Sequence, residues 1–176
     1  DFYKNYICEI IIKSLEEMDD IPRRDEFFKN VIYKRNISEN FMISLLTSEY
    51  QYRSSRANPG YDNSFIILGY IKAAEILLAE LLSLKKDSDG DDELYNSTIG
   101  ELIIKLKQQL FLNEIDQSES KSVKEYLLRY LTYWKNKIRN GYVHKDFLTK
   151  DNVDKTRRES LRIIYMLITN HEIYSV

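Results

Sequence analysis

The chain has 176 residues, which is the size of one globular domain and long enough to bury a core. Apolar residues make up 43% and charged residues 31%, a balance that excludes an intrinsically disordered protein. Five glycines and two prolines are too few turn residues for a β-sandwich or β-barrel. The formal net charge of −2 argues against a protein that coats nucleic acid without preference.

The single cysteine, Cys8, lies in an apolar run and cannot form a disulfide within the chain. We therefore expect a buried thiol in a reducing compartment. No apolar stretch approaches the length of about 20 residues that a membrane span needs. Charges are interspersed among the first residues, unlike a signal peptide, and the absence of an initial Met is expected of a domain taken from a longer protein. The sequence predicts a cytoplasmic protein.

Helical periodicity dominates the first third of the sequence. Apolar residues recur at helical spacing over 2–18, and Pro22 is placed to occupy the first turn of a second helix at about 23–34. Ser38 is a candidate N-cap for a third helix. We expect residues 1–60 to form an N-terminal helical extension packed on the rest of the chain.

The segment 63–86 is apolar on nearly every side, which predicts a central helix with several neighbours. The acidic run 87–93 follows it. This run does not fit a calcium-binding EF-hand loop, because Asp92 stands where such a loop needs Gly and Thr98 stands where it needs Glu. A solvated loop is the simpler interpretation.

Three further helices are expected. A capping-box pattern at Thr98 and Glu101 opens a helix to about residue 111, and the same pattern at Ser122 and Glu125 opens one to about residue 139. The last helix is expected at about 153–170, capped by Thr149 or Asp151. The chain is therefore predicted to be all-α and compact, with an antiparallel helical bundle over residues 61–176.

Several catalytic and metal-binding patterns are absent. The sequence has no Gly-rich phosphate loop, no His-Glu-x-x-His and no Cys cluster. The two histidines, His144 and His171, follow Gly141 and Ile168 at the spacing where a di-metal bundle site needs Glu. We expect no metal and no cofactor.

The segment from Trp134 to Lys145 contains Arg139, Asn140 and His144, an Arg-x4-His pattern with Asn directly after Arg. Asn140-Gly141 is expected to stop a helix in the left-handed conformation, with His144 in the turn before the last helix. An Arg guanidinium can bind a phosphate through two hydrogen bonds, and a histidine, with its reference pKa of about 6.5, can move protons at neutral pH. In RNA the 2′-hydroxyl lies beside the phosphate, so these groups suit cleavage without a metal.

On Arg139, Asn140 and His144 the sequence resembles the HEPN superfamily, helical bundles whose ribonuclease members carry Arg-x4–6-His between the last two long helices. The apolar segment 63–86 also looks like the preceding core helix of bacterial members, and the likeness extends over about 60–172. The resemblance implies metal-independent RNA cleavage that leaves a cyclic phosphate, a homodimer with a composite active site, and a role as a toxin or antiviral effector.

The resemblance has one departure. Some toxin members have a Tyr two residues after the His that an antitoxin nucleotidyltransferase modifies, whereas Asp146 stands there in this chain. Control by an antitoxin of that kind is therefore not expected, although another antitoxin or additional domains remain compatible with the resemblance.

Residues around the motif are candidate supporting groups. Trp134 is expected to pack in the core, and Glu75 is either an acid that supports the motif or part of a solvated edge. The candidate RNA-binding residues are Lys137, Tyr142 and Lys145. Residues 121–162 hold 12 Lys and Arg against 5 Asp and Glu, a local charge of +7 that leaves −9 for the remainder.

Three functions fit the sequence. The first is an endoribonuclease. The second is a non-catalytic HEPN-type module that binds RNA or a nucleotide, or that dimerises a larger protein. The third is a helical adaptor that uses apolar faces for partner binding. Against the first two, Arg139 could simply compensate a helix C-terminal dipole, with His144 an ordinary loop residue.

Overall fold

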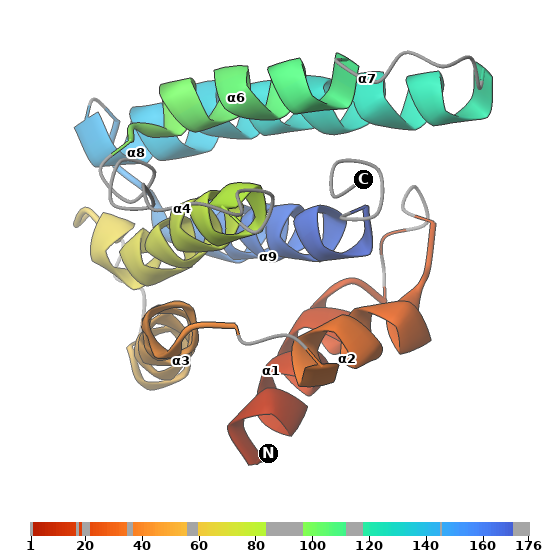
Figure 1. The fold of residues 1–176 in the computed structure, drawn as a ribbon. Helices are drawn as coiled ribbons and strands as arrows, with labels where there is room; N and C mark the ends of the chain where they lie inside the picture. The colour runs from red at the N-terminus through yellow and green to blue at the C-terminus, as the bar shows by residue number, and fades with distance from the viewer. Residues whose placement is uncertain are drawn as a thin grey trace.

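The computed structural model of the chain describes residues 2–16, 18, 22–34, 37–55, 60–83, 97–111, 118–144 and 146–170. Over these ranges the protein is helical and contains no β-strand, so the predicted all-α class is confirmed. The helices form three layers (Figure 1), with α4 and α9 in the middle, α6 and α7 on one side, and α1, α2 and α3 on the other.

The first layer contains α1 (Phe2–Ser14), α2 (Asp25–Lys34) and α3 (Glu39–Ser54). Helix α1 is four residues shorter than its apolar pattern suggested. The prediction for Pro22 was wrong, because α2 begins three residues after it. Ser38 caps α3 as predicted, and its hydroxyl accepts a hydrogen bond from the amide of Phe41 at 3.2 Å.

The middle layer contains a short 3₁₀ helix, η1 (Ser64–Ile66), followed by α4 (Leu68–Ser83), and α9 (Lys150–Thr169). Helix α4 is central, as predicted, and contacts α3, α6 and α9. Helix α9 is equally central, because it contacts α1, α2, α4 and α7, and every residue from Ser160 to Thr169 is buried. The predicted cap position Thr149 precedes it, but its hydroxyl accepts from the Asn152 side chain at 3.0 Å and makes no capping hydrogen bond to a helix amide.

The third layer contains α6 (Ile99–Phe111), α7 (Ser118–Trp134), the π-helix η2 (Lys135–Arg139) and α8 (Asn140–His144). The capping box at the start of α6 is confirmed, since the Glu101 carboxylate accepts from the Thr98 amide at 2.7 Å and the Glu101 amide donates to the Thr98 hydroxyl. The second predicted box was wrong. Helix α7 begins at Ser118, so Ser122 lies inside the helix.

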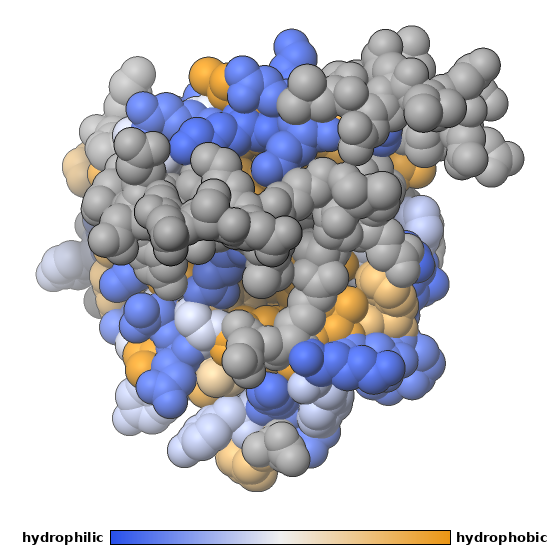
Figure 2. Space-filling view, in the orientation of Figure 1, coloured by the Kyte–Doolittle hydropathy of each residue, from blue (hydrophilic) through white to orange (hydrophobic). Residues whose placement is uncertain are grey.

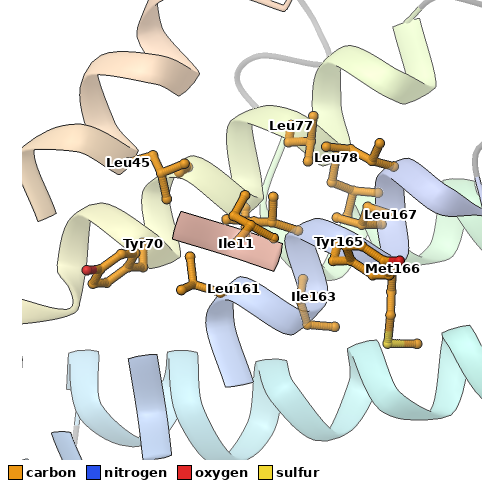
Figure 3. Close-up of a cluster of buried hydrophobic side chains, with 14 of the residues drawn as sticks. Ile11, Leu45, Tyr70, Leu77, Leu78, Leu161, Ile163, Tyr165, Met166 and Leu167 are labelled. Atoms are coloured by element: carbon orange, nitrogen blue, oxygen red, sulfur yellow. The ribbon is translucent and has the colours of Figure 1, made fainter. Parts of the chain in front are cut away.

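One hydrophobic cluster joins the layers. In Figure 3, Ile11 of α1 lies among side chains of α3, α4 and α9, including Leu45, Leu78 and Leu161. Figure 2 shows hydrophilic side chains over α6, with apolar side chains between the end of α9 and α2. The three N-terminal helices thus share their core with the bundle, and no described helix is long and apolar enough to cross a membrane.

Candidate functional site

The segment that carries the Arg-x4-His pattern continues a helix and does not end one. Helix α7 reaches Trp134, whose fully buried indole donates to the Ser160 hydroxyl at 3.3 Å. The chain then passes through the π-helix and directly into α8. Wide helical turns of this kind occur often at functional sites.

The predicted stop at Asn140-Gly141 was therefore wrong. Asn140 has φ −75° and ψ −30°, and Gly60 is the one residue with positive φ within the described ranges. Ile138 and Gly141 are buried, and this packing outweighs the local preference of Asn-Gly for a turn. A β-carbon on Gly141 would lie 3.3 Å from an Asp146 carboxylate oxygen, and the Asp146 amide donates to the Gly141 carbonyl at 2.8 Å.

Acceptors on Glu75 and Asn140 hold the Arg139 side chain. Its Nε donates to Oε1 of Glu75 on α4 at 2.9 Å, and its Nη1 donates to Oδ1 of the neighbouring Asn140 at 3.2 Å. The Arg139 and Glu75 side chains are 24% and 27% exposed, so the ion pair is accessible to a ligand. The structure thus brings together three of the residues that the sequence singled out.

His144 is the last residue of α8, five positions after Arg139. The prediction that it lies in a turn was therefore wrong. Its side chain lies outside the part that the structure describes, as do Lys145 and His171. Lys137 is exposed on η2. Tyr142 is half-buried and packs against the core, which leaves part of its ring at the surface.

The segment after the motif is tied to the start of α4 by residues that the sequence analysis missed. The Leu148 carbonyl accepts from the amide and the side-chain nitrogen of Asn63, at 3.0 and 3.1 Å, and the Leu148 amide donates to the Asp62 carboxylate at 3.1 Å. The Ser64 hydroxyl and amide also donate to Asp62, and these hydrogen bonds hold the pKa of Asp62 below its usual range. The pattern Asp-x-Ser before an apolar run was the available signal.

The described residues contain no group of three or more His, Cys, Asp or Glu side chains that could hold a metal ion. Chemically, the site offers a fixed guanidinium, an amide and a carboxylate beside a histidine position. Comparison of the chain with protein-family models, with curated proteins and with solved structures found no match.

Proposed function

We propose that this protein is a metal-independent endoribonuclease of HEPN type that acts in the cytoplasm, within a toxin or antiviral-defence system. The observation that carries the proposal is the placement of Arg139, which Glu75 and Asn140 orient at the start of the short helix that ends in His144. The five residue steps from Arg139 to His144 correspond to about 7.5 Å along the helix axis.

In this reaction His144 takes the proton from the ribose 2′-hydroxyl, and the resulting oxyanion attacks the adjacent phosphorus. The bond from phosphorus to the 5′-oxygen breaks, and that oxygen takes a proton from an acid. The products are a 2′,3′-cyclic phosphate and a free 5′-hydroxyl. Arg139 binds the phosphate and stabilises the charge that builds up on its oxygens, while Asn140 orients the guanidinium.

A second copy of the chain would complete the site. The reaction needs a base and an acid, and the motif of one chain contains one histidine. Residues five positions apart on an α-helix also leave its axis in directions about 140° apart, so a pair from one chain does not face one way. Exposed apolar side chains beside the motif suit a homodimer interface, and these are Tyr133, Val143 and Phe147.

The test is cleavage of 5′-labelled single-stranded RNA in EDTA, with the product ends identified. We expect the wild-type protein to leave a 2′,3′-cyclic phosphate, and His144→Ala to lower the rate by about 100-fold or more. Arg139→Lys keeps the charge but loses the bidentate geometry, so we expect it to lower the cleavage rate less than His144→Ala does. His171→Ala is the matched control and should cleave like the wild type.

Circular dichroism verifies that each variant keeps its helical signal. Equal cleavage by His144→Ala and the wild type would refute the assignment, as would products that lack the cyclic phosphate.

One observation favours the non-catalytic alternative, a module that binds RNA. The Glu75 carboxylate already neutralises Arg139, which lowers the attraction of this site for phosphate. If the module only binds RNA, Glu75→Gln should raise RNA affinity and no variant should show turnover. If the protein is the nuclease, Glu75→Gln should lower the cleavage rate at saturating RNA, because Arg139 loses its orientation.

A further inference from the structure

Arg157 of α9 is a buried cation that donates hydrogen bonds to side chains of α1 and α3, two helices of the first layer in Figure 1. The residue is 8% exposed. Its Nη2 donates to both oxygens of Glu49 on α3, at 3.0 and 2.8 Å, and its Nη1 donates to the Ser14 hydroxyl of α1 at 3.0 Å. Its Nε donates to Glu49 at 3.0 Å and to the Tyr70 hydroxyl of α4 at 3.1 Å. One guanidinium thus links four helices.

Positive charge exceeds negative charge in this cluster. Glu49 is 1% exposed and also accepts from Nε of Arg53 at 2.7 Å, so one carboxylate compensates two guanidinium groups. Burial alone would raise the pKa of Glu49, but the Tyr70 hydroxyl and the two guanidinium groups outweigh it and hold the pKa below its usual 4.5. Glu49 is therefore ionised at neutral pH, and the cluster carries a net charge of about +1.

A hollow of about 450 Å³ opens in front of this cluster, between α1, α3 and α9. Its walls include four cationic side chains, Lys13, Arg53, Arg157 and Arg158, against the two carboxylates of Glu9 and Glu49. Lys13 forms no ion pair with the described residues, and neither terminal nitrogen of Arg53 donates a hydrogen bond to them. Asp154, whose carboxylate accepts from the Tyr52 hydroxyl at 2.7 Å, adds a third carboxylate beside the walls, so the net charge there is about +1, and two cationic groups remain available to a ligand.

Aromatic rings stand beside these cations. The Cζ of Arg157 lies 4.4 Å from the centre of the Tyr52 ring, and that of Arg53 lies 5.5 Å from the centre of the Tyr6 ring. A second hollow of about 370 Å³, mostly apolar, shares Tyr6 and Arg53 and is also lined by Leu46 and Tyr50. A charged compartment and an apolar one thus lie next to each other.

We propose that the paired hollows form a binding site for a phosphate monoester that carries an aromatic or apolar group. The phosphate lies between Lys13 and Arg53, and the apolar group lies against Tyr50 and Leu46. A phosphate monoester carries nearly two negative charges and three acceptor oxygens at neutral pH, so it can pair with both Lys13 and the terminal nitrogens of Arg53, whereas a carboxylate carries one charge and two oxygens. The site is separate from Arg139, which lies on η2 in the third layer and pairs with Glu75 of α4.

The experiment measures binding of phenyl phosphate, inorganic phosphate and phenol by calorimetry at low salt. We expect phenyl phosphate to bind about tenfold more tightly than either of the other two, since only it fills both compartments. Lys13→Gln and Arg53→Gln should each weaken the binding of phenyl phosphate by about tenfold, because each removes a charge-assisted hydrogen bond. Glu9→Gln should strengthen binding, a gain that a misfolded variant could not produce.

Lys107→Gln, on the far layer, is the matched control and should bind like the wild type. The proposal is overturned if phenyl phosphate shows no binding at about 10 mM, which is weaker than any specific site. It is also overturned if Lys13→Gln and Arg53→Gln bind as tightly as Lys107→Gln. Binding lost in Arg139→Gln and kept in Arg53→Gln would place the ligand at the proposed nuclease site and contradict this one. RNA cleavage, measured separately, does not depend on these outcomes.

Discussion

Glu49 shows how strongly a single residue can couple distant parts of this chain. It accepts hydrogen bonds from Arg53, Tyr70 and Arg157, and its partners come from three helices. Removing one member of a buried ion pair leaves the other charge without compensation, which costs far more than the intact pair contributes. A nearly isosteric substitution of Glu49 is therefore expected to have a large effect on the stability of the fold.

We predict that Glu49→Gln lowers the free energy of unfolding by about 3 kcal/mol or more, because Arg157 then keeps a buried charge without its carboxylate. Urea denaturation measures this. Glu26→Gln, which removes an exposed carboxylate paired with Lys29, is the control and should leave the midpoint unchanged. A loss for Glu49→Gln as small as that of the control would contradict the prediction.

The same residue gives stability a pH dependence. The pKa of Glu49 is lower in the folded than in the unfolded protein, so its contribution is fully present above about 4.5 and is lost as pH falls through the folded value. We therefore expect the melting temperature of the wild type to decrease once the pH drops below about 4.5, and this decrease to be smaller in Glu49→Gln. Parallel curves for the two proteins would contradict this assignment, which thermal melts between pH 3 and 7 can test.

Helices α3 and α4 pack with an unusually close backbone approach at Gly69. A β-carbon there would lie 2.6 Å from the Ser44 carbonyl oxygen and 2.9 Å from the Ser48 hydroxyl oxygen, which donates to the Ile66 carbonyl and cannot move freely. Gly100 in α6 differs, because its nearest neighbour would be the flexible end of Lys135 at 3.6 Å. The two glycines form a natural comparison.

We predict that Gly69→Ala destabilises the protein by about 1–3 kcal/mol, because α3 and α4 must separate. Gly100→Ala should be neutral or stabilising by up to roughly 1 kcal/mol, since Ala restricts the unfolded chain and fits the helix. Thermal denaturation of both variants provides the measurement. If Gly69→Ala melts at or above the temperature of Gly100→Ala, the close contact does not limit stability.

The elements that the sequence predicted well are those fixed by local contacts. Ser38 and the Thr98–Glu101 pair cap their helices through groups three positions apart, so the pattern alone contains the interaction. The same pattern failed at Ser122, because the helix had already begun four residues earlier. At Asn140 a local turn preference was overruled by packing, which no local pattern contains.

Contacts between distant residues could not be predicted in this way. Glu49 and Arg157 are 108 positions apart, and Asn63 and Leu148 are 85 apart. Their pairing depends on how the layers assemble. For the candidate site, the sequence identified Arg139 and Asn140 and left Glu75 as either a supporting acid or part of a solvated edge, and only the fold pairs Glu75 with Arg139.

Part of the molecule's basic charge is buried and so does not contribute to the surface. Residues 121–162 carry an excess of +7, but Arg157 and Arg162 within that range are buried. Arg162 donates to the Tyr126 hydroxyl and lies 4.3 Å from the centre of the Tyr130 ring. The basic charge available to RNA near the motif is therefore smaller than the count indicates. Exposed residues such as Lys137 are then the stronger candidates for phosphate contacts.

If RNA binds at the motif, its affinity must fall with salt. We predict a linear plot of log affinity against log salt, with a slope of about −0.7 for each phosphate contacted on a single strand. Lys137→Gln should reduce that slope by about 0.7, whereas Lys34→Gln, on the opposite layer, should not change it. Fluorescence anisotropy at several salt concentrations between about 50 and 300 mM measures it. Equal slopes for the two variants would argue against Lys137 as a phosphate contact.

The position of α9 also bears on how the protein is made. This helix separates the two outer layers and buries ten consecutive residues against them, yet it is the last helix of the described chain to leave the ribosome. Helices α1 and α2 must wait for a partner that lies more than 110 residues downstream, and such long-range closure slows folding. The segment with Arg139 is synthesised before α9, so it gains its folded surroundings only when synthesis of this region is nearly complete.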